Sequence, residues 1–301
     1  MKNFFTFILA VSFSVSALHA QLLTTGIGSP YFEQMVKSKL MVVLTGQQEF
    51  DENITKAVQA YWKVTPYEFI ELKNIDNHIQ DKSLSFLVPL KTIVTFSSYS
   101  SSSPSSPKNS YSKTKSWFVI VNGGKKSFKK YIENDAIAFS PFNLYGDEEN
   151  YEKSAYRADY MVKGMNDGIE ITKNKKISGG PASMPFKMIA IINERSKVLT
   201  KKTLVINKDI MNYYGKAVYE EDDFKKNYPY KYKFVPLQEF REIVAGKSDE
   251  YLCLLPAFEV NKHVLIYDTS TRETVFYGWS MQGMNVGKKD MEKMIEAVSG
   301  K

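Results

Sequence analysis

The chain contains little cysteine and little histidine, the residue types on which many metal sites and nucleophilic active sites depend. Its 301 residues include one cysteine and three histidines. Cys253 therefore has no intramolecular disulfide partner. Because it lies in the apolar run 251–255, we expect it to be a small buried hydrophobe. An exported protein so poor in cysteine must be held together by packed cores.

The histidines are isolated along the chain. Neither His78 nor His263 has a close partner at the spacing of a zinc site, and neither lies in a Gly-x-Ser-x-Gly setting. We interpret His78 as part of a helix surface and His263 as the start of a strand. The sequence therefore predicts no catalytic residue, no metal ligand and no cofactor, and it leaves the binding residues unknown.

Long apolar runs are also missing beyond residues 1–20. This first segment has a basic start, an apolar run and small residues at its end, which is the layout of a secretory signal peptide. Cleavage after Ala20 would make Gln21 the first residue, and cleavage after Ala17 is the alternative. A membrane anchor, the other interpretation, would need about 20 apolar residues. We expect an exported protein, in the periplasm, at the cell surface or in the medium, that is not transmembrane after signal removal.

The charge of the chain is modest. The formal net charge is +7, and lysines are interleaved with acidic residues along most of the sequence. Nucleic-acid-binding proteins concentrate basic residues on one face, so we expect a mixed, solvated surface and no nucleic-acid partner. Attraction to an anionic lipid or glycan is the more natural use of the surplus.

The sequence does contain a faint internal repeat. Residues 21–171 and 186–301 both open on a strand dense in branched apolar residues, at 40–44 and 203–206. Both end on an amphipathic helix. We predict an α/β fold of two tandem related β-α-β-α-β-β-β-α domains, with mixed sheets and helices packed on them; a chance likeness is the alternative. The apolar residues of the two final helices are Ala155, Ala158, Val162 and Met165, and Met291, Met294, Ile295 and Val298.

The closest local match lies in the middle of each half, where an apolar strand carries a late proline. An edge position or a bulge would tolerate Pro89 and Pro256. We expect Leu87 and Leu254, just before these prolines, to occupy equivalent buried positions in two separate cores.

The first half has a segment that the second half lacks. Residues 97–116 are dominated by serine and include two prolines, so we expect a flexible loop that is too polar to pack. A strand at 117–121 should then turn at residues 122–124 and return through 128–132, because Asn-Gly is a strong hairpin signal.

Two further boundaries can be placed. An amphipathic helix in the first half has Asp51 or Asn53 available as its N-cap. Residues 172–185 are rich in lysine, glycine and serine, which predicts a linker between the two domains.

Motifs that suggest phosphate or calcium binding have simpler explanations. Residues 123–126 read Gly-Gly-Lys-Lys but lack the spacing of a Walker motif, and a hairpin turn explains them better. The acidic clusters at 147–149 and 220–223 lack the alternating ligands of an EF-hand loop, and the first is placed to begin a helix.

Two other features have both a structural and a functional interpretation. Asn53 opens a formal glycosylation sequon, but a helix start is the simpler interpretation. Aromatic residues are abundant, and we expect those in strands to form the core. An exposed binding face at Tyr213, Tyr214 or residues 228–232 is the alternative.

Residues 57–63 and 67–70, together with a signal ending in Ala20-Gln21, resemble a group of exported Bacteroidetes proteins, which implies export and no particular activity. The element order of each half is similar to the small α/β domain of curli-secretion and TolB N-terminal type proteins, and to the thioredoxin fold. Neither half has a Cys-x-x-Cys before its first helix, so the chain departs from an active thioredoxin. This likeness concerns the fold and implies no function.

Two hypotheses about function follow. The first is an exported non-enzymatic envelope or surface protein that binds another macromolecule, a protein or glycan of the envelope, through its paired α/β domains. The second is a hydrolase acting on glycan or peptide, with a site between the two halves. A pocket where carboxylates or a histidine converge would favour the hydrolase.

Overall fold

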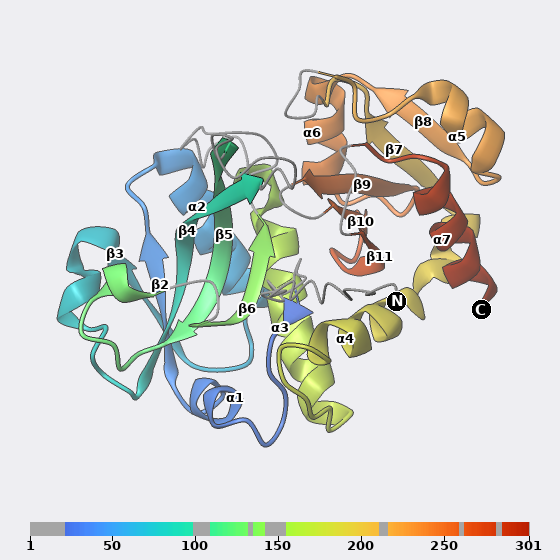
Figure 1. The fold of residues 1–301 in the computed structure, drawn as a ribbon. Helices are drawn as coiled ribbons and strands as arrows, with labels where there is room; N and C mark the ends of the chain where they lie inside the picture. Colours follow the sequence, from blue (N-terminus) through green and yellow to red (C-terminus); the bar gives the residue numbers. More distant parts are fainter. Residues whose placement is uncertain are drawn as a thin grey trace, which may run out of the picture.

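The computed structural model shows an α/β protein with two mixed sheets, one in each half of the sequence (Figure 1). This is the predicted fold class. The expected signal peptide, the acidic cluster at 147–149 and the pair Tyr213-Tyr214 lie outside the described residues. The structure describes residues 22–98, 109–131, 135–141, 155–210, 216–258, 262–280 and 285–300.

The first sheet has the strand order β1-β6-β5-β4-β2-β3. Strand β2 runs parallel to both of its neighbours, whereas β5 runs antiparallel to both β4 and β6. Helices α2 and α3 pack on one another. The elements are β1 (Leu22–Leu23), α1 (Pro30–Met35), β2 (Lys39–Leu44), α2 (Gln48–Tyr61), β3 (Tyr67–Glu71), the 3-10 helix η1 (Leu72–Asn77), β4 (Leu84–Ser98), β5 (Asn109–Asn122), the 3-10 helix η2 (Phe128–Lys130), β6 (Ala136–Pro141) and α3 (Ala158–Asn174).

The second sheet has the order β11-β10-β9-β7-β8, which repeats the first sheet without β1. Helix α4 and the 3-10 helix η5 connect the two halves. The elements are α4 (Met184–Asn193), η5 (Ser196–Thr200), β7 (Thr203–Asn207), α5 (Glu221–Asn227), β8 (Tyr232–Val235), α6 (Leu237–Ala245), β9 (Tyr251–Phe258), β10 (Lys262–Asp268), β11 (Thr274–Ser280) and α7 (Lys288–Ser299). None of the helices in the described part of the chain combines the length and apolar character needed to cross a membrane.

The parallel strands of the two sheets share one backbone register. In each half the first residue of the opening strand, β2 or β7, donates its backbone N–H to the residue just before β4 or β9. The second residue of that strand donates its backbone N–H to the residue just before β3 or β8. Such agreement between hydrogen bonds supports an internal duplication. The pairs are Lys39 with Ser83 and Leu40 with Pro66, and Thr203 with Glu250 and Leu204 with Lys231.

The antiparallel strands agree in the same way. Leu87 lies opposite Ile120 in the first sheet, and Leu254 lies opposite Ile266 in the second. A β-bulge interrupts the next ladder directly after each isoleucine. Because bulges are local features that tend to be retained within a family, this shared position is further support for duplication.

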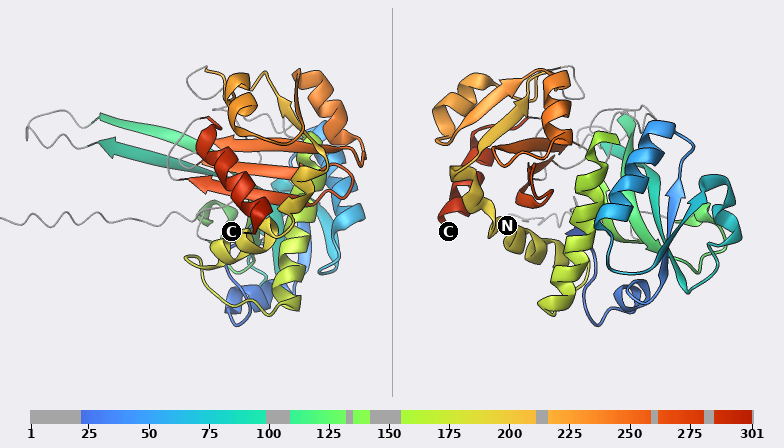
Figure 2. Two further views of the ribbon diagram at one scale, coloured as in Figure 1. Left: turned by 90° about the vertical axis from the view of Figure 1, so that its right-hand side faces the viewer. Right: turned by 180° about the vertical axis from the view of Figure 1, so that it is seen from behind.

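The two leucines are buried in different apolar clusters, with Leu87 1% and Leu254 0% exposed. Their clusters nevertheless differ in composition. The cluster of Leu87 also contains residues of the second sheet, including Cys253 and Leu265, with residues of α3 such as Tyr160 among them. Helix α3 therefore lies between the two sheets (Figures 1 and 2), and the halves share part of one core.

The remaining sheet faces are covered by local elements. On the first sheet, Ile75, Ile79 and Tyr131 complete a cluster made only of residues from the first half. On the second sheet, α5 and α7 cover the face that carries Leu254. The segment between β5 and β6, which includes Tyr131, is longer than the turn between β10 and β11, and it supplies the first sheet with its own cover.

The two prolines occupy edge-like positions, as predicted. Strand β4 pairs with β2 only as far as Leu87, so Pro89 lies beyond the parallel ladder. Strand β9 pairs with β7 only as far as Cys253, so Pro256 lies beyond it as well. Neither proline removes a hydrogen bond from that ladder.

The loop expected at 97–116 is wrong at both of its ends, where residues 97–98 and 109–116 belong to strands. Strand β4 continues to Ser98, β5 begins at Asn109, and these two residues pair; residues 99–108 lie outside the described part. Composition misled here because an antiparallel ladder satisfies the backbone of a polar strand without a core. Figure 2 shows the resulting hairpin projecting from the body of the molecule.

The hairpin expected to return through 128–132 is also wrong. The strand that returns beside β5 is β6, and Phe128–Lys130 form the short helix η2. Gly123 donates its N–H to Leu84 O at 2.8 Å, and a Cβ on Gly123 would lie 2.0 Å from Asp81 O. The glycine thus permits a close approach to the preceding segment rather than a tight hairpin.

Two boundaries shift relative to the sequence-based expectation. Helix α2 begins at Gln48, before the expected cap, and Asp51 instead accepts the N–H groups of Thr45 and Gly46, both at 2.8 Å. Helix α3 continues to Asn174 and α4 begins at Met184, so both ends of the expected linker 172–185 are helical.

Candidate functional site

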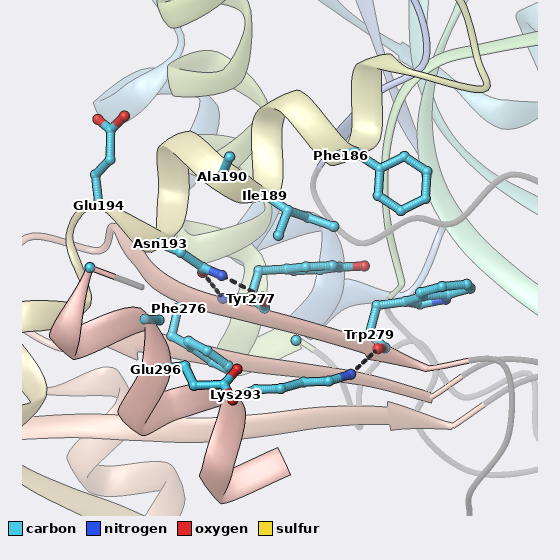
Figure 3. Close-up of a pocket in the computed structure, with 13 residues that line it drawn as sticks. Phe186, Ile189, Ala190, Asn193, Glu194, Phe276, Tyr277, Trp279, Lys293 and Glu296 are labelled. Carbon is cyan, nitrogen blue, oxygen red and sulfur yellow. Dashed lines mark hydrogen bonds between the residues drawn. The ribbon is translucent and has the colours of Figure 1, made fainter. Parts of the chain in front are cut away.

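A groove of about 510 Å³ lies between α4, β11 and α7. Aromatic and small apolar side chains form most of its surface, with one lysine and two glutamates among them (Figure 3). This makes it a surface for recognition by shape and aromatic contact. The lining residues are Phe186, Ile189, Ala190, Asn193, Glu194, Phe276, Tyr277, Gly278, Trp279, Lys293, Glu296, Ala297 and Gly300.

Both helical walls follow from the helical repeat. Residues that lie i, i+3, i+4 and i+7 share one face of a helix. The groove takes such a set from α4 and another from the end of α7, while the opposite faces of both helices hold buried methionines. The two sets are Phe186, Ile189, Ala190 and Asn193, and Lys293, Glu296, Ala297 and Gly300.

The floor of the groove is the outer edge of β11, and two side chains hold its backbone. The carboxamide of Asn193 accepts the N–H of Tyr277 at 2.7 Å and donates to its carbonyl oxygen at 3.1 Å. The exposed Lys293 donates to Trp279 O at 2.6 Å. Asn193 therefore acts as a one-residue substitute for a neighbouring strand at an edge that pairs with no other strand in the described part of the chain.

The aromatic end of the groove is formed by Phe186 and Trp279, whose rings meet edge to face at 6.3 Å. Phe186 is 50% exposed. The indole Nε1 of Trp279 is buried and has no hydrogen-bond partner among the described residues. Phe186 therefore offers an exposed aromatic surface, whereas the indole N–H of Trp279 is enclosed by the protein.

The residues that chemistry would require for nucleophilic catalysis lie elsewhere. His78 is exposed at the end of η1, and His263 is buried in β10, where its Nδ1 lies 2.6 Å from the hydroxyl of Tyr277. These are the positions predicted for both histidines. In the described part of the chain no three His, Cys, Asp or Glu side chains converge as a metal site would require.

Cys253 is the buried hydrophobe that the sequence predicts. Burial raises the pKa of its thiol to about 12. We expect a thiol reagent at pH 8 to leave the folded protein unlabelled and to label it fully in denaturant. The thiolate is the reactive form, and unfolding restores the ordinary pKa near 9.0. Rapid labelling under native conditions would contradict this.

The raised pKa also has a consequence for stability. Above about pH 9 the unfolded chain releases this proton and the folded chain retains it, so the thiol lowers stability as pH rises toward 12.

A buried polar network joins the two halves outside the groove. Arg272, in the turn between β10 and β11, donates to the hydroxyl of Tyr160 at 2.6 Å and to the carbonyl oxygens of Val244 and Ala245 at 2.6 and 2.7 Å. Its φ is 61°, in the left-handed region. The side chain thus links α3 of the first half to the end of α6 in the second.

The other sequence motifs that lie within the described residues have structural roles. Residues 220–223 form the cap and first turn of α5, where acidic side chains interact favourably with the helix dipole. Asn53 lies within α2. Tyr228 is buried against Phe224, in agreement with a core role for the aromatics at 228–232.

Sequence reasoning did not find the groove residues. The spacing of Phe186, Ile189, Ala190 and Asn193 was a usable signal, because it places an aromatic residue and a carboxamide on one helix face opposite the buried methionines. Nothing local connects that face with Trp279, since the contact depends on the tertiary fold. Compared with family models, with curated proteins and with solved structures, the chain matches none of them.

Proposed function

We propose that the protein is an exported, non-enzymatic envelope protein that binds another macromolecule through its paired α/β domains, and that the groove between α4, β11 and α7 is its binding site. The observation that carries this proposal is the composition of the groove. Its surface is mainly aromatic and apolar, and the described histidines and the cysteine lie outside it. Such a surface suits recognition rather than bond cleavage.

The aromatic residues narrow the class of partner. Phe186 and Trp279 present ring faces and edges that can contact either the apolar side chains of a protein or the sugar rings of a glycan. Export, on which the envelope location depends, rests on the signal-like residues 1–20.

The alternative, a hydrolase, has one supporting feature: Glu194 and Glu296 both line the groove. They come from different walls, and Figure 3 shows the side chain of Glu194 pointing away from Glu296. Glu194 is paired with Lys175 at 3.2 Å. A carboxylate that is already paired and turned outward is poorly placed as the second member of a catalytic pair.

A photo-crosslinking residue in place of Phe186 tests the proposal in intact cells. We expect a discrete adduct with one envelope macromolecule, because half of this side chain is exposed at the mouth of the groove. Tyr31, which is 62% exposed on α1 and is not a lining residue of the groove, gives the matched control. Equal adducts at both positions, or none at Phe186, would refute the binding role.

An assay for cleavage of candidate substrates distinguishes the binding protein from the hydrolase. The purified chain is incubated with envelope glycans and with peptides, and the products are followed by mass spectrometry. We expect no cleavage. Cleavage that disappears in Glu296→Gln but persists in Tyr31→Ala would establish the hydrolase instead.

A further inference from the structure

The junction between the two halves contains a buried cation that no described residue neutralises. Arg157, the N-cap residue of α3, is 2% exposed. Its Nη1 has no hydrogen-bond partner, and its guanidinium forms no ion pair with the described residues. A charge that is removed from water and left unpaired is costly. A negatively charged group from outside the described residues would remove that cost.

A second arginine approaches the same place from the other half. The guanidinium carbon of Arg241, on α6, lies 5.6 Å from the centre of the ring of Tyr156. Burial raises the pKa of the Tyr156 hydroxyl, and the charges of Arg157 and Arg241 both oppose that rise. The Nε of Arg241 is also buried without a hydrogen-bond partner. The two cations therefore act on one hydroxyl, one from each half of the chain.

Arg272 brings a third positive charge to the junction. Burial raises the pKa of the Cys253 thiol to about 12, and the charges of Arg272 and Arg157 lower it in part. The Nε of Arg272 lies 3.5 Å from a carboxylate oxygen of Asp159. Among the described residues this is the one carboxylate paired with any of the three arginines. Three positive charges therefore face one negative charge, which leaves an excess of two.

The helix ends at the junction do not remove this excess. Helix α3 begins here, and no side chain caps its first N–H groups, which carry a partial positive charge. The carbonyl groups at the end of α6 carry the opposite partial charge. Those of Val244 and Ala245 already accept hydrogen bonds from Arg272, and Val244 O accepts a further one from Tyr160.

We infer that the junction is an anion-binding site in which Arg157 is the anchoring residue and a phosphate group is the ligand. An excess of two positive charges matches a phosphate dianion better than a carboxylate, which carries one negative charge. Guanidinium groups bind phosphate oxygens through pairs of N–H donors, and the N-terminus of a long helix adds backbone donors. The three arginines do not line the groove, so this site is separate from the proposed binding function.

Calorimetric titration with inorganic phosphate tests the site in the chain from Gln21 onward. The titration is made at pH 8, where phosphate is a dianion, with sodium chloride holding the ionic strength constant. We expect saturable binding that Arg157→Gln weakens about tenfold or more, because charge-assisted hydrogen bonds are lost. Glycerol 3-phosphate is titrated in parallel. The tighter binder of the two identifies free phosphate or a phosphate ester as the source.

Lys173→Gln is the matched control. It removes the same charge from the same helix, about 24 Å farther along the axis, where Lys173 is paired with Glu170. We expect it to bind phosphate like the parent chain. Arg241→Gln, which alters a partly exposed side chain, should weaken binding and provides a second variant if Arg157→Gln does not fold.

Thermal unfolding of Arg157→Met reverses its rank with phosphate. Without phosphate the variant should melt no lower than the parent, because an uncompensated buried charge has been replaced by an apolar side chain. At saturating phosphate the parent should melt higher, since only the parent gains stability from the ligand. A variant that melts below the parent in both buffers would show that the chain neutralises Arg157 itself, which overturns the site.

Two further outcomes also overturn the inference. One is the absence of saturable binding of both phosphate and glycerol 3-phosphate. The other is a stabilisation that rises without saturation and equally in the parent and in Arg157→Met, which is the general effect of an excluded salt. Crosslinking at Phe186 does not depend on either result, so failure of the anion site leaves the proposed function standing.

Discussion

Replacing Arg272 with alanine is expected to lower the free energy of unfolding by about 1.5 to 3 kcal/mol, because it removes a buried side chain that makes charge-assisted hydrogen bonds to both halves. The side chain is 2% exposed. Its removal leaves Ala245 O and the oxygen of the Tyr160 hydroxyl without their donor, and Val244 O with the Tyr160 hydroxyl as its one remaining side-chain donor. Unsatisfied buried acceptors are costly because water cannot replace the lost partner. Urea unfolding followed by circular dichroism measures the change.

Arg272→Gly is the matched variant. It removes the same hydrogen bonds, but glycine adopts a φ of 61° without the strain that a Cβ imposes. We expect the glycine variant to be more stable than the alanine variant by about 1 kcal/mol. If both variants unfold like the parent chain, Arg272 does not hold the two halves together. If alanine equals glycine, the left-handed turn stores no strain.

Leu87→Ala and Leu254→Ala are each expected to cost about 2 to 5 kcal/mol, because each removes methyl groups from a packed interior. The two leucines occupy equivalent strand positions in different apolar clusters. Sites without shared partners usually add within about 0.5 kcal/mol. We therefore expect the double variant to lose the sum of the single losses, measured by the same unfolding experiment.

A second pair of substitutions serves as a positive control for energetic coupling. Leu254 lies directly opposite Ile266 on the neighbouring strand, so Leu254→Ala and Ile266→Val should not add. Strong coupling between Leu87 and Leu254, comparable to that between the neighbours, would mean that the two clusters respond as one core and would contradict their separation.

Local pattern was sufficient for the order of most elements of the repeat, although β1, α1 and α4 were not predicted and the strand β6 was expected at 128–132. Strands such as Tyr67–Glu71 and Tyr232–Val235 alternate aromatic and polar residues, and the final helices carry one apolar face each. These signals arise within a few residues of one another, so a single sequence reveals them. The common register of the two sheets was not visible, because it depends on which distant backbone groups meet.

The structural features that the sequence did not predict share a physical cause. The polar strands before Ser98 and after Asn109 are stabilised by backbone pairing, which composition does not report. Strand β1 is too short to produce an alternating pattern. The groove combines Phe186, Trp279 and Lys293 from three elements that are far apart in the sequence. None of these arrangements produces a recognisable pattern within a short stretch of sequence.

The position of α3 between the two sheets has a consequence for the order in which the protein is made. The first half can cover both faces of its sheet with its own residues, and it emerges from the ribosome first. The second half needs α3 to cover Cys253, Leu265 and Tyr267, and α3 has then already been synthesised. Folding can therefore proceed in the direction of synthesis, with the finished first half acting as a template. A chain whose halves were exchanged in order would expose the apolar face of its first-made sheet until the last helix arrived.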